Sequence, residues 1–154
     1  YLDEFQFYFS NLLNFPNSEV AMGNLGVAYQ GRGYIGSSID SWFQGSQANP
    51  EYDVCWYNLS SAFLSRGPVN PNYFPLVFNS LPPELCQHAF NKDPMRSHIH
   101  FARYFLQKAL LARTCHFPQQ WRNELIKVEY ELMKPMGTIR KAQLVKPIIL
   151  EKRK

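Results

Sequence analysis

The sequence predicts an all-α protein, built as a stack of helical hairpins, and three observations lead to this prediction. Apolar residues recur three and four positions apart over long stretches, as they do on one face of an α-helix. The chain repeats itself at an offset of 34 residues. Glycines or prolines stand at the ends of the periodic stretches, where helices stop. With 154 residues, of which 45% are hydrophobic, the chain is long enough for one core and too apolar for wholesale disorder.

The repeat is densest between residues 20 and 33. Six of these fourteen positions carry the same residue 34 positions later: Val20 and Val54, Asn24 and Asn58, Leu25 and Leu59, Ala28 and Ala62, Arg32 and Arg66, Gly33 and Gly67. One helical hairpin cannot bury its apolar face alone, so a repeat of this kind must stack on its neighbours.

The repeated residues resemble the tetratricopeptide repeat, whose signature is W-x2-L-G-x2-Y, then A-x3-F, then P. The first part is matched by Trp56-x2-Leu59-Ser60-x2-Phe63 and, with Met in place of Trp, by Met22-x2-Leu25-Gly26-x2-Tyr29. The second part is matched by Ser38-x3-Trp42 followed by Pro50, and by Glu4-x3-Tyr8 followed by Pro16. The resemblance covers residues 1–67 and implies an α-solenoid, a right-handed superhelix with a concave face.

The end signals divide residues 1–67 into a half repeat (1–18), a full repeat (19–52) and a repeat start (53–67). Helices are predicted over residues 2–14, 19–31, 35–48 and 53–66. Gly31 and Gly33 stand where the second of these helices stops and the chain turns. Asn49-Pro50 ends the third, because proline lacks an amide hydrogen and restricts the residue before it.

Residues 68–135 break the pattern and predict an irregular helical cap packed on the repeats. Six prolines lie between residues 68 and 94. Asn70-Pro71 and Asp93-Pro94 each resemble a helix N-cap followed by proline in the first turn. Helices are therefore expected over 71–80, 83–91, 94–115 and 118–134, the last two antiparallel. Residues 98–105 also resemble the first helix of a further, worn repeat.

Residues 136–154 predict an extended basic tail. Residues 120–154 hold nine basic and four acidic residues, net +5, whereas residues 1–119 hold seven and eight, net −1. Such an end is typical of contacts with acidic protein, nucleic acid or anionic lipid, and equally of a solvated tail. The residues expected to dock this tail on a partner or on the stack are Lys146, Ile148, Ile149, Leu150, Lys152, Arg153 and Lys154.

Asn24 and Asn58 are the first candidates for binding, because they occupy the same place in successive repeats. In some tetratricopeptide superhelices, such as that of O-linked N-acetylglucosamine transferase, an asparagine here hydrogen-bonds the backbone of a bound peptide. The resemblance carries that role to Asn24 and Asn58 only, and a merely structural pair stays the alternative. The family's lysine-containing carboxylate clamp is disfavoured, since residues 19–31 and 53–66 contain no lysine. The predicted concave face comprises Val20, Asn24, Val54, Tyr57, Asn58 and Ser61.

All four histidines and two of the three cysteines lie between residues 86 and 116, which raises the question of a metal site. The members are Cys86, His88, His98, His100, Cys115 and His116. Four such ligands suit zinc, but residues two apart on a helix face different ways and no zinc-finger spacing occurs. The sequence therefore predicts neither a metal nor a cofactor. Unpaired cysteines without a CxxC favour a reducing, cytoplasmic compartment.

The predicted function is non-enzymatic protein binding, as a scaffold or subunit of a larger assembly. The sequence lacks GxSxG, HExxH, Walker and paired-carboxylate patterns. It also lacks a run of 18 apolar residues that could span a membrane. The first residue is not methionine, so we expect a processed chain or a piece of a longer protein.

Two alternatives remain open. Residues 3–26 loosely resemble the repeat tail of some lipid-linked sugar transferases. This chain would then be the non-catalytic C-terminal part of a larger membrane enzyme, in the periplasm or a lumen. The other alternative is an RNA-associated assembly subunit that docks through its basic tail.

Overall fold

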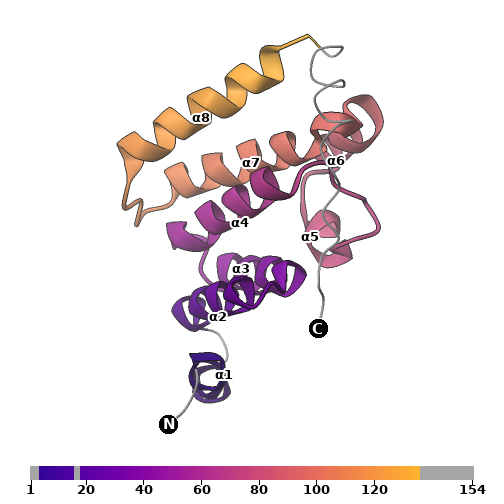
Figure 1. The fold of residues 1–154 in the computed structure, drawn as a ribbon. Helices are drawn as coiled ribbons and strands as arrows, with labels where there is room; N and C mark the ends of the chain where they lie inside the picture. Colours follow the sequence, from indigo (N-terminus) through magenta and orange to yellow (C-terminus); the bar gives the residue numbers. More distant parts are fainter. Residues whose placement is uncertain (1–3, 16–17, 136–154) are drawn as a thin grey trace.

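The structure is a computed structural model that describes residues 4–15 and 18–135, and all regular structure within these ranges is helical (Figure 1). This confirms the all-α class. The α-helices are α1 (Glu4–Asn14), α2 (Glu19–Gly31), α3 (Ile35–Ala48), α4 (Asp53–Arg66), α5 (Pro75–Ser80), α6 (Pro83–Gln87), α7 (Ser97–Leu111) and α8 (Pro118–Met133). A π-helical turn, η1 (His88–Lys92), and a 3₁₀ turn, η2 (Pro94–Arg96), connect α6 to α7.

Helices α2, α3 and α4 begin and end at the predicted residues because the local end signals act as expected. The hydroxyl of Ser18 accepts a hydrogen bond from the amide of Ala21 at 3.1 Å and caps α2. Gly33 has φ +82° in the turn to α3, and Gly67 has φ +84° after α4. These are left-handed conformations, which glycine adopts without a steric penalty.

The first large helix contact joins α2 to α3, and it depends on a small residue. A methyl group at Gly26 would lie 2.2 Å from Nε1 of Trp42, so only glycine lets the indole cross α2 here. The indole donates a hydrogen bond to the carbonyl oxygen of Gly23 at 3.0 Å. The hydroxyl of Ser38 donates to the carbonyl oxygen of Gly26 at 2.8 Å.

The second large contact joins α4 to α7, not to the next helix along the chain (Figure 1). The hydroxyl of Ser60 donates to the carbonyl oxygen of Ala102 at 2.8 Å. Ser60 corresponds to Gly26 at the 34-residue offset, so α7 packs on α4 as α3 packs on α2. Residues 98–105 thus lie in the partner helix of α4, whereas their resemblance was to the leading helix of a new hairpin. The 67–96 segment intervenes between the two partners.

The core lies where α4, α5 and α7 meet, and it is mainly aromatic. Phe63 is the centre, with its ring centroid 5.5 Å from that of Phe105 and 6.0 Å from that of Phe101. Phe74 and Phe78 cover it from the side of α5. Helix α8 then packs on α7, as predicted, and buries Trp121 and Val128. Within the described ranges, no helix is both long and apolar enough to cross a membrane.

The predicted helix start at Asn70 is wrong, whereas a helical turn, η2, does begin at Pro94 after Asp93. Neither side chain caps a helix, because both have other partners. The side-chain oxygen of Asn70 accepts from the amide of Asn72 at 2.9 Å, which makes a turn, and α5 begins only at Pro75. The carboxylate of Asp93 makes no capping bond and instead binds side chains of the following turns. The last turn predicted for the 94–115 helix is a loop, tied to Asp53 by the backbone amide of His116 at 2.6 Å.

Candidate functional site

The predicted concave face is open on α2. Val20 and Asn24 are exposed, and Val27, one turn further, is exposed as well. Residues 20, 24 and 27 lie on one side of an α-helix, so Asn24 stands between two exposed valines on the same face. No described group hydrogen-bonds the carboxamide of Asn24.

The same face on α4 is half covered. Val54 and Asn58 are half-buried and Ser61 is exposed. No group among the described residues hydrogen-bonds the carboxamide of Asn58. Ser61 and Leu64 line a small cavity of about 40 Å³, which Glu124 of α8 borders.

Tyr57 is half-buried, because α8 packs on it. Its ring stacks on that of Trp121, with centroids 4.7 Å apart and planes 11° from parallel. Its hydroxyl donates to Oε1 of Glu124 at 3.1 Å. Burial, and then the charge of Glu124, raise the pKa of Tyr57 above its usual value. Tyr57 therefore joins α4 to α8, and its place on a binding face stays a prediction.

An apolar groove continues from α4 onto α8. Its cavity measures about 480 Å³ and is lined by Leu64, Ile99, Ile126, Lys127, Val128, Tyr130 and Glu131. Leu64 also lines the small cavity beside Ser61, so the two hollows are adjacent. The predicted docking residues of the tail, Lys146, Ile148, Ile149, Leu150, Lys152, Arg153 and Lys154, lie outside the described residues.

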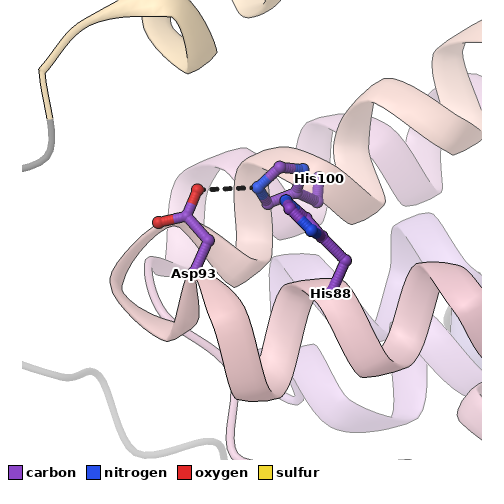
Figure 2. A group of neighbouring side chains, drawn as sticks. All are labelled: His88, Asp93 and His100. Atoms are coloured by element: carbon purple, nitrogen blue, oxygen red, sulfur yellow. Dashed lines mark hydrogen bonds and ion pairs between the residues drawn. The ribbon is translucent and has the colours of Figure 1, made fainter.

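The structure brings together two of the four histidines, with an aspartate that the sequence pattern did not single out (Figure 2). His88, Asp93 and His100 each offer a ligand atom, and the three atoms lie within 4.8 Å of one another. Nε2 of His100 lies 2.8 Å from Oδ2 of Asp93. The rings of His88 and His100 meet edge to face, with centroids 4.7 Å apart. Two imidazoles and a carboxylate are a donor set for a divalent metal.

The π-helical turn η1 creates this cluster. The amide of Asp93 donates to the carbonyl oxygen of His88 at 3.0 Å, a hydrogen bond between residues five apart. This bond closes the turn between His88 and Asp93, which follows the last residue of η1. Of the residues between them, Ala89 is fully buried and Phe90 packs on Phe78 and Phe101, whereas Asn91 and Lys92 are exposed.

Asp93 and His100 are buried, whereas His88 is exposed. Burial lowers the pKa of His100, and the hydrogen bond to Asp93 opposes this effect only in part. The imidazole is therefore neutral near pH 7, as a metal ligand must be. A cavity of about 460 Å³ adjoins the pair, lined by Glu84, Leu85, His88, His100, Arg103, Tyr104 and Gln107.

The other candidate ligands lie elsewhere. His98 is buried on α7, and His116 binds Asp53 with its Nδ1 atom 2.8 Å from Oδ1. The thiol of Cys86 donates to the carbonyl oxygen of Phe78 at 3.5 Å. Cys115 is half-buried in the α7–α8 loop, and all three cysteines are free thiols.

No protein-family model, no curated protein and no solved structure matches this chain. The tetratricopeptide resemblance accordingly rests on the residues quoted above.

Proposed function

We propose that this chain is a non-enzymatic protein-interaction module that binds a peptide segment of another protein along α2 and α4. In this proposal the hairpins are tetratricopeptide-like and stack as a right-handed solenoid, with the chain acting as a subunit of a larger assembly. The observation that carries the proposal is the pair Asn24 and Asn58. Both carboxamides are accessible and without a hydrogen-bond partner among the described residues.

A carboxamide supplies a donor and an acceptor together, which is what the backbone of an extended peptide requires. The apolar neighbours of the two asparagines supply side-chain contacts: Val20 and Val27 on α2 and Val54 on α4. Helices α2 and α4 are held side by side, since the thiol of Cys55 lies 3.7 Å from the carbonyl oxygen of Glu19. The two asparagines thus sit on neighbouring helices of a fixed frame.

The packing order supports a solenoid. Helix α2 pairs with α3 and α4 pairs with α7, while α4 also packs on α3 and α8 on α7. The leading helices of this order are α2, α4 and α8, and they carry the proposed binding face. Because Tyr57 is held under α8, the face passes from Asn58 to Ser61 and Leu64 and then to the groove on α8.

The test begins with peptides selected by display on the intact chain, whose affinity is then measured by calorimetry. We expect the double variant Asn24→Ala/Asn58→Ala to weaken binding at least about tenfold, the effect of leaving buried backbone groups of the peptide unpaired. The control is Gln44→Ala/Gln47→Ala, which removes two exposed amides from α3 and leaves affinity unchanged.

The peptide supplies a second arm. A peptide whose central backbone amides are N-methylated should bind the wild type more weakly than the unmodified peptide does. The double variant should bind the two peptides with equal affinity. Unchanged affinity in the double variant, at an unchanged melting temperature, would overturn the proposal. Loss of binding only on truncation after Pro135 would also overturn it, because the interaction would then belong to the tail.

A further inference from the structure

We propose that His88, Asp93 and His100 bind a divalent transition-metal ion of the zinc type, a site separate from the peptide-binding face. The two imidazoles and the carboxylate converge from η1, the η1–η2 junction and α7 (Figure 2). Within the described ranges these residues form the cluster whose ligand atoms lie within 4.8 Å of one another.

The spacing fits a metal after small movements of the three side chains. Ligand atoms about 2.1 Å from a tetrahedral zinc ion lie roughly 3.4 Å from each other. Nε2 of His100 and Oδ2 of Asp93 are already 2.8 Å apart, closer than that value. His88 is exposed and can rotate about its side-chain bonds toward the buried pair. To share an ion, Nε2 of His100 and Oδ2 of Asp93 must give up their hydrogen bond and separate by roughly 0.6 Å.

Asp93 has one carboxylate oxygen that makes no hydrogen bond. Its Oδ2 lies 2.8 Å from both Nε of Arg96 and Nε2 of His100, whereas its Oδ1 is buried and has no hydrogen-bond partner among the described residues. A buried carboxylate oxygen without a partner is costly, since it loses water and gains nothing in return. This oxygen points away from the two histidine rings in Figure 2, so an ion held by both rings would meet the carboxylate at Oδ2.

Arg96 holds the carboxylate in place. Its Nη1 atom donates to the backbone carbonyl oxygens of Glu131, Leu132 and Lys134 at the end of α8, at 3.0–3.2 Å. Much of the guanidinium charge is thereby directed at carbonyl dipoles. Arg96, which the end of α8 holds, thus orients the carboxylate of Asp93, as neighbouring groups orient the ligands of natural metal sites.

The ion would keep an open coordination position. Three protein ligands leave one place in a tetrahedral shell, and His88 and His100 both border the cavity of about 460 Å³. The charged groups that line this cavity are Glu84, on the same helical side as His88, and Arg103 on α7. A water molecule or an anion drawn by Arg103 would fill the open place. The donor set of two nitrogens and one oxygen favours zinc over calcium or magnesium.

The test titrates the untagged, EDTA-stripped chain with zinc chloride by calorimetry, and with cobalt chloride by visible absorption. We expect one ion per chain and a d–d spectrum typical of four-coordinate cobalt. His88→Gln should weaken zinc binding at least about tenfold, since loss of even a supporting neighbour costs that much at metal sites. His88 is exposed, so this variant tests the ligand without disturbing the core.

The matched control is His116→Gln, which removes a histidine outside the cluster and leaves a side chain that can still reach Asp53. Its zinc affinity should equal that of the wild type. Nitrogen-15 shifts of the His88 and His100 rings should move with zinc, which identifies the ligands in the unmutated chain. The proposal is overturned if zinc does not bind, if His88→Gln binds it as tightly as the wild type, or if His116→Gln is the variant that loses it.

Discussion

The hydroxyl of Ser60 donates a hydrogen bond to the carbonyl oxygen of Ala102 at 2.8 Å, across 42 residues of sequence. One repeat earlier, the hydroxyl of Ser38 donates to the carbonyl oxygen of Gly26 at the same distance. The donor is on the trailing helix in one hairpin and on the leading helix in the other. In both, a small residue allows the two helices to approach closely and a serine hydroxyl joins their backbones.

Gly26→Ala should destabilise the fold by about 3 kcal/mol, because the added methyl group would overlap the buried indole of Trp42. The indole cannot give way, since its Nε1 atom is hydrogen-bonded to Gly23. Urea denaturation followed by circular dichroism measures the loss.

The matched control is Gly31→Ala in the last turn of the same helix, where nothing lies within 4 Å of the new methyl group. It should stabilise the protein by roughly 0.4–1 kcal/mol through the unfolded state. Equal effects of the two substitutions would show that close crossing at Gly26 does not limit stability.

Arg96→Lys should cost about 2–4 kcal/mol in EDTA, because a buried lysine cannot bind Asp93 and the three carbonyl groups of α8 together. Amide exchange at residues 131–134 should accelerate more than exchange at the start of α8. Arg113→Lys is the control: its side chain is 82% exposed beside Glu51, so the stability should change by less than about 0.5 kcal/mol. An Arg96→Lys chain as stable as the control would contradict this role.

The helices up to Gly67 were predictable because each carries its own start or stop signal. Ser18, Gly33 and Pro50 act over a few residues, and the 34-residue repeat supplies a second, independent alignment. The partner of α4 was not predictable. Twenty-nine residues lie between Gly67 and Ser97, so α7 does not follow α4 at the spacing of the 34-residue repeat.

The sequence indicated the histidines of the candidate metal cluster but not its aspartate. The histidines stood out by their density, but spacing alone did not show which two meet. Asp93 beside Pro94 resembled a helix cap, a local signal that its tertiary bonds to Arg96 and His100 override. The π turn that brings Asp93 to His88 depends on Ala89 and Phe90 reaching the core, which is a property of the packed fold.

Asp53→Ala should destabilise the protein by about 2–4 kcal/mol and loosen the α7–α8 loop. The carboxylate is fully buried at the start of α4, where it accepts from the backbone amide of His116 at 2.6 Å and from the hydroxyl of Thr114 at 3.2 Å. Its removal leaves the backbone amide of His116 unpaired, whereas the hydroxyl of Thr114 keeps the carbonyl oxygen of Glu51 at 2.6 Å. Hydrogen exchange over residues 112–117 reports the loosening, and Glu129→Ala, an exposed carboxylate on α8, is the neutral control.

Cys55 should make the fold sensitive to alkali. Its thiol is fully buried between α2 and α4, and burial, aided by the charges of Glu19 and Asp53, raises the pKa of Cys55 to about 12. In the unfolded chain the thiol ionises near its usual value of 9.0. Between these values the unfolded state binds fewer protons than the folded state. The free energy of unfolding therefore falls as the pH rises, by at most about 1.4 kcal/mol per pH unit.

Urea titrations from pH 7.5 to 10.5 measure this slope in the wild type and in Cys55→Ala. The wild type should lose stability more steeply above pH 9, whatever the starting stability of the variant. Burial and Glu124 also raise the pKa of Tyr57, and this effect is common to both chains. The pKa of Tyr52 is raised mainly by burial and then by Cys55, so its contribution is smaller in the variant. The rate at which a thiol reagent modifies Cys55 at pH 8 is a second measurement. We expect Cys55 to react only after the protein unfolds. Identical slopes in the two chains would show that the thiol ionises in the folded state as readily as in the unfolded one, and that the contact between α2 and α4 admits water.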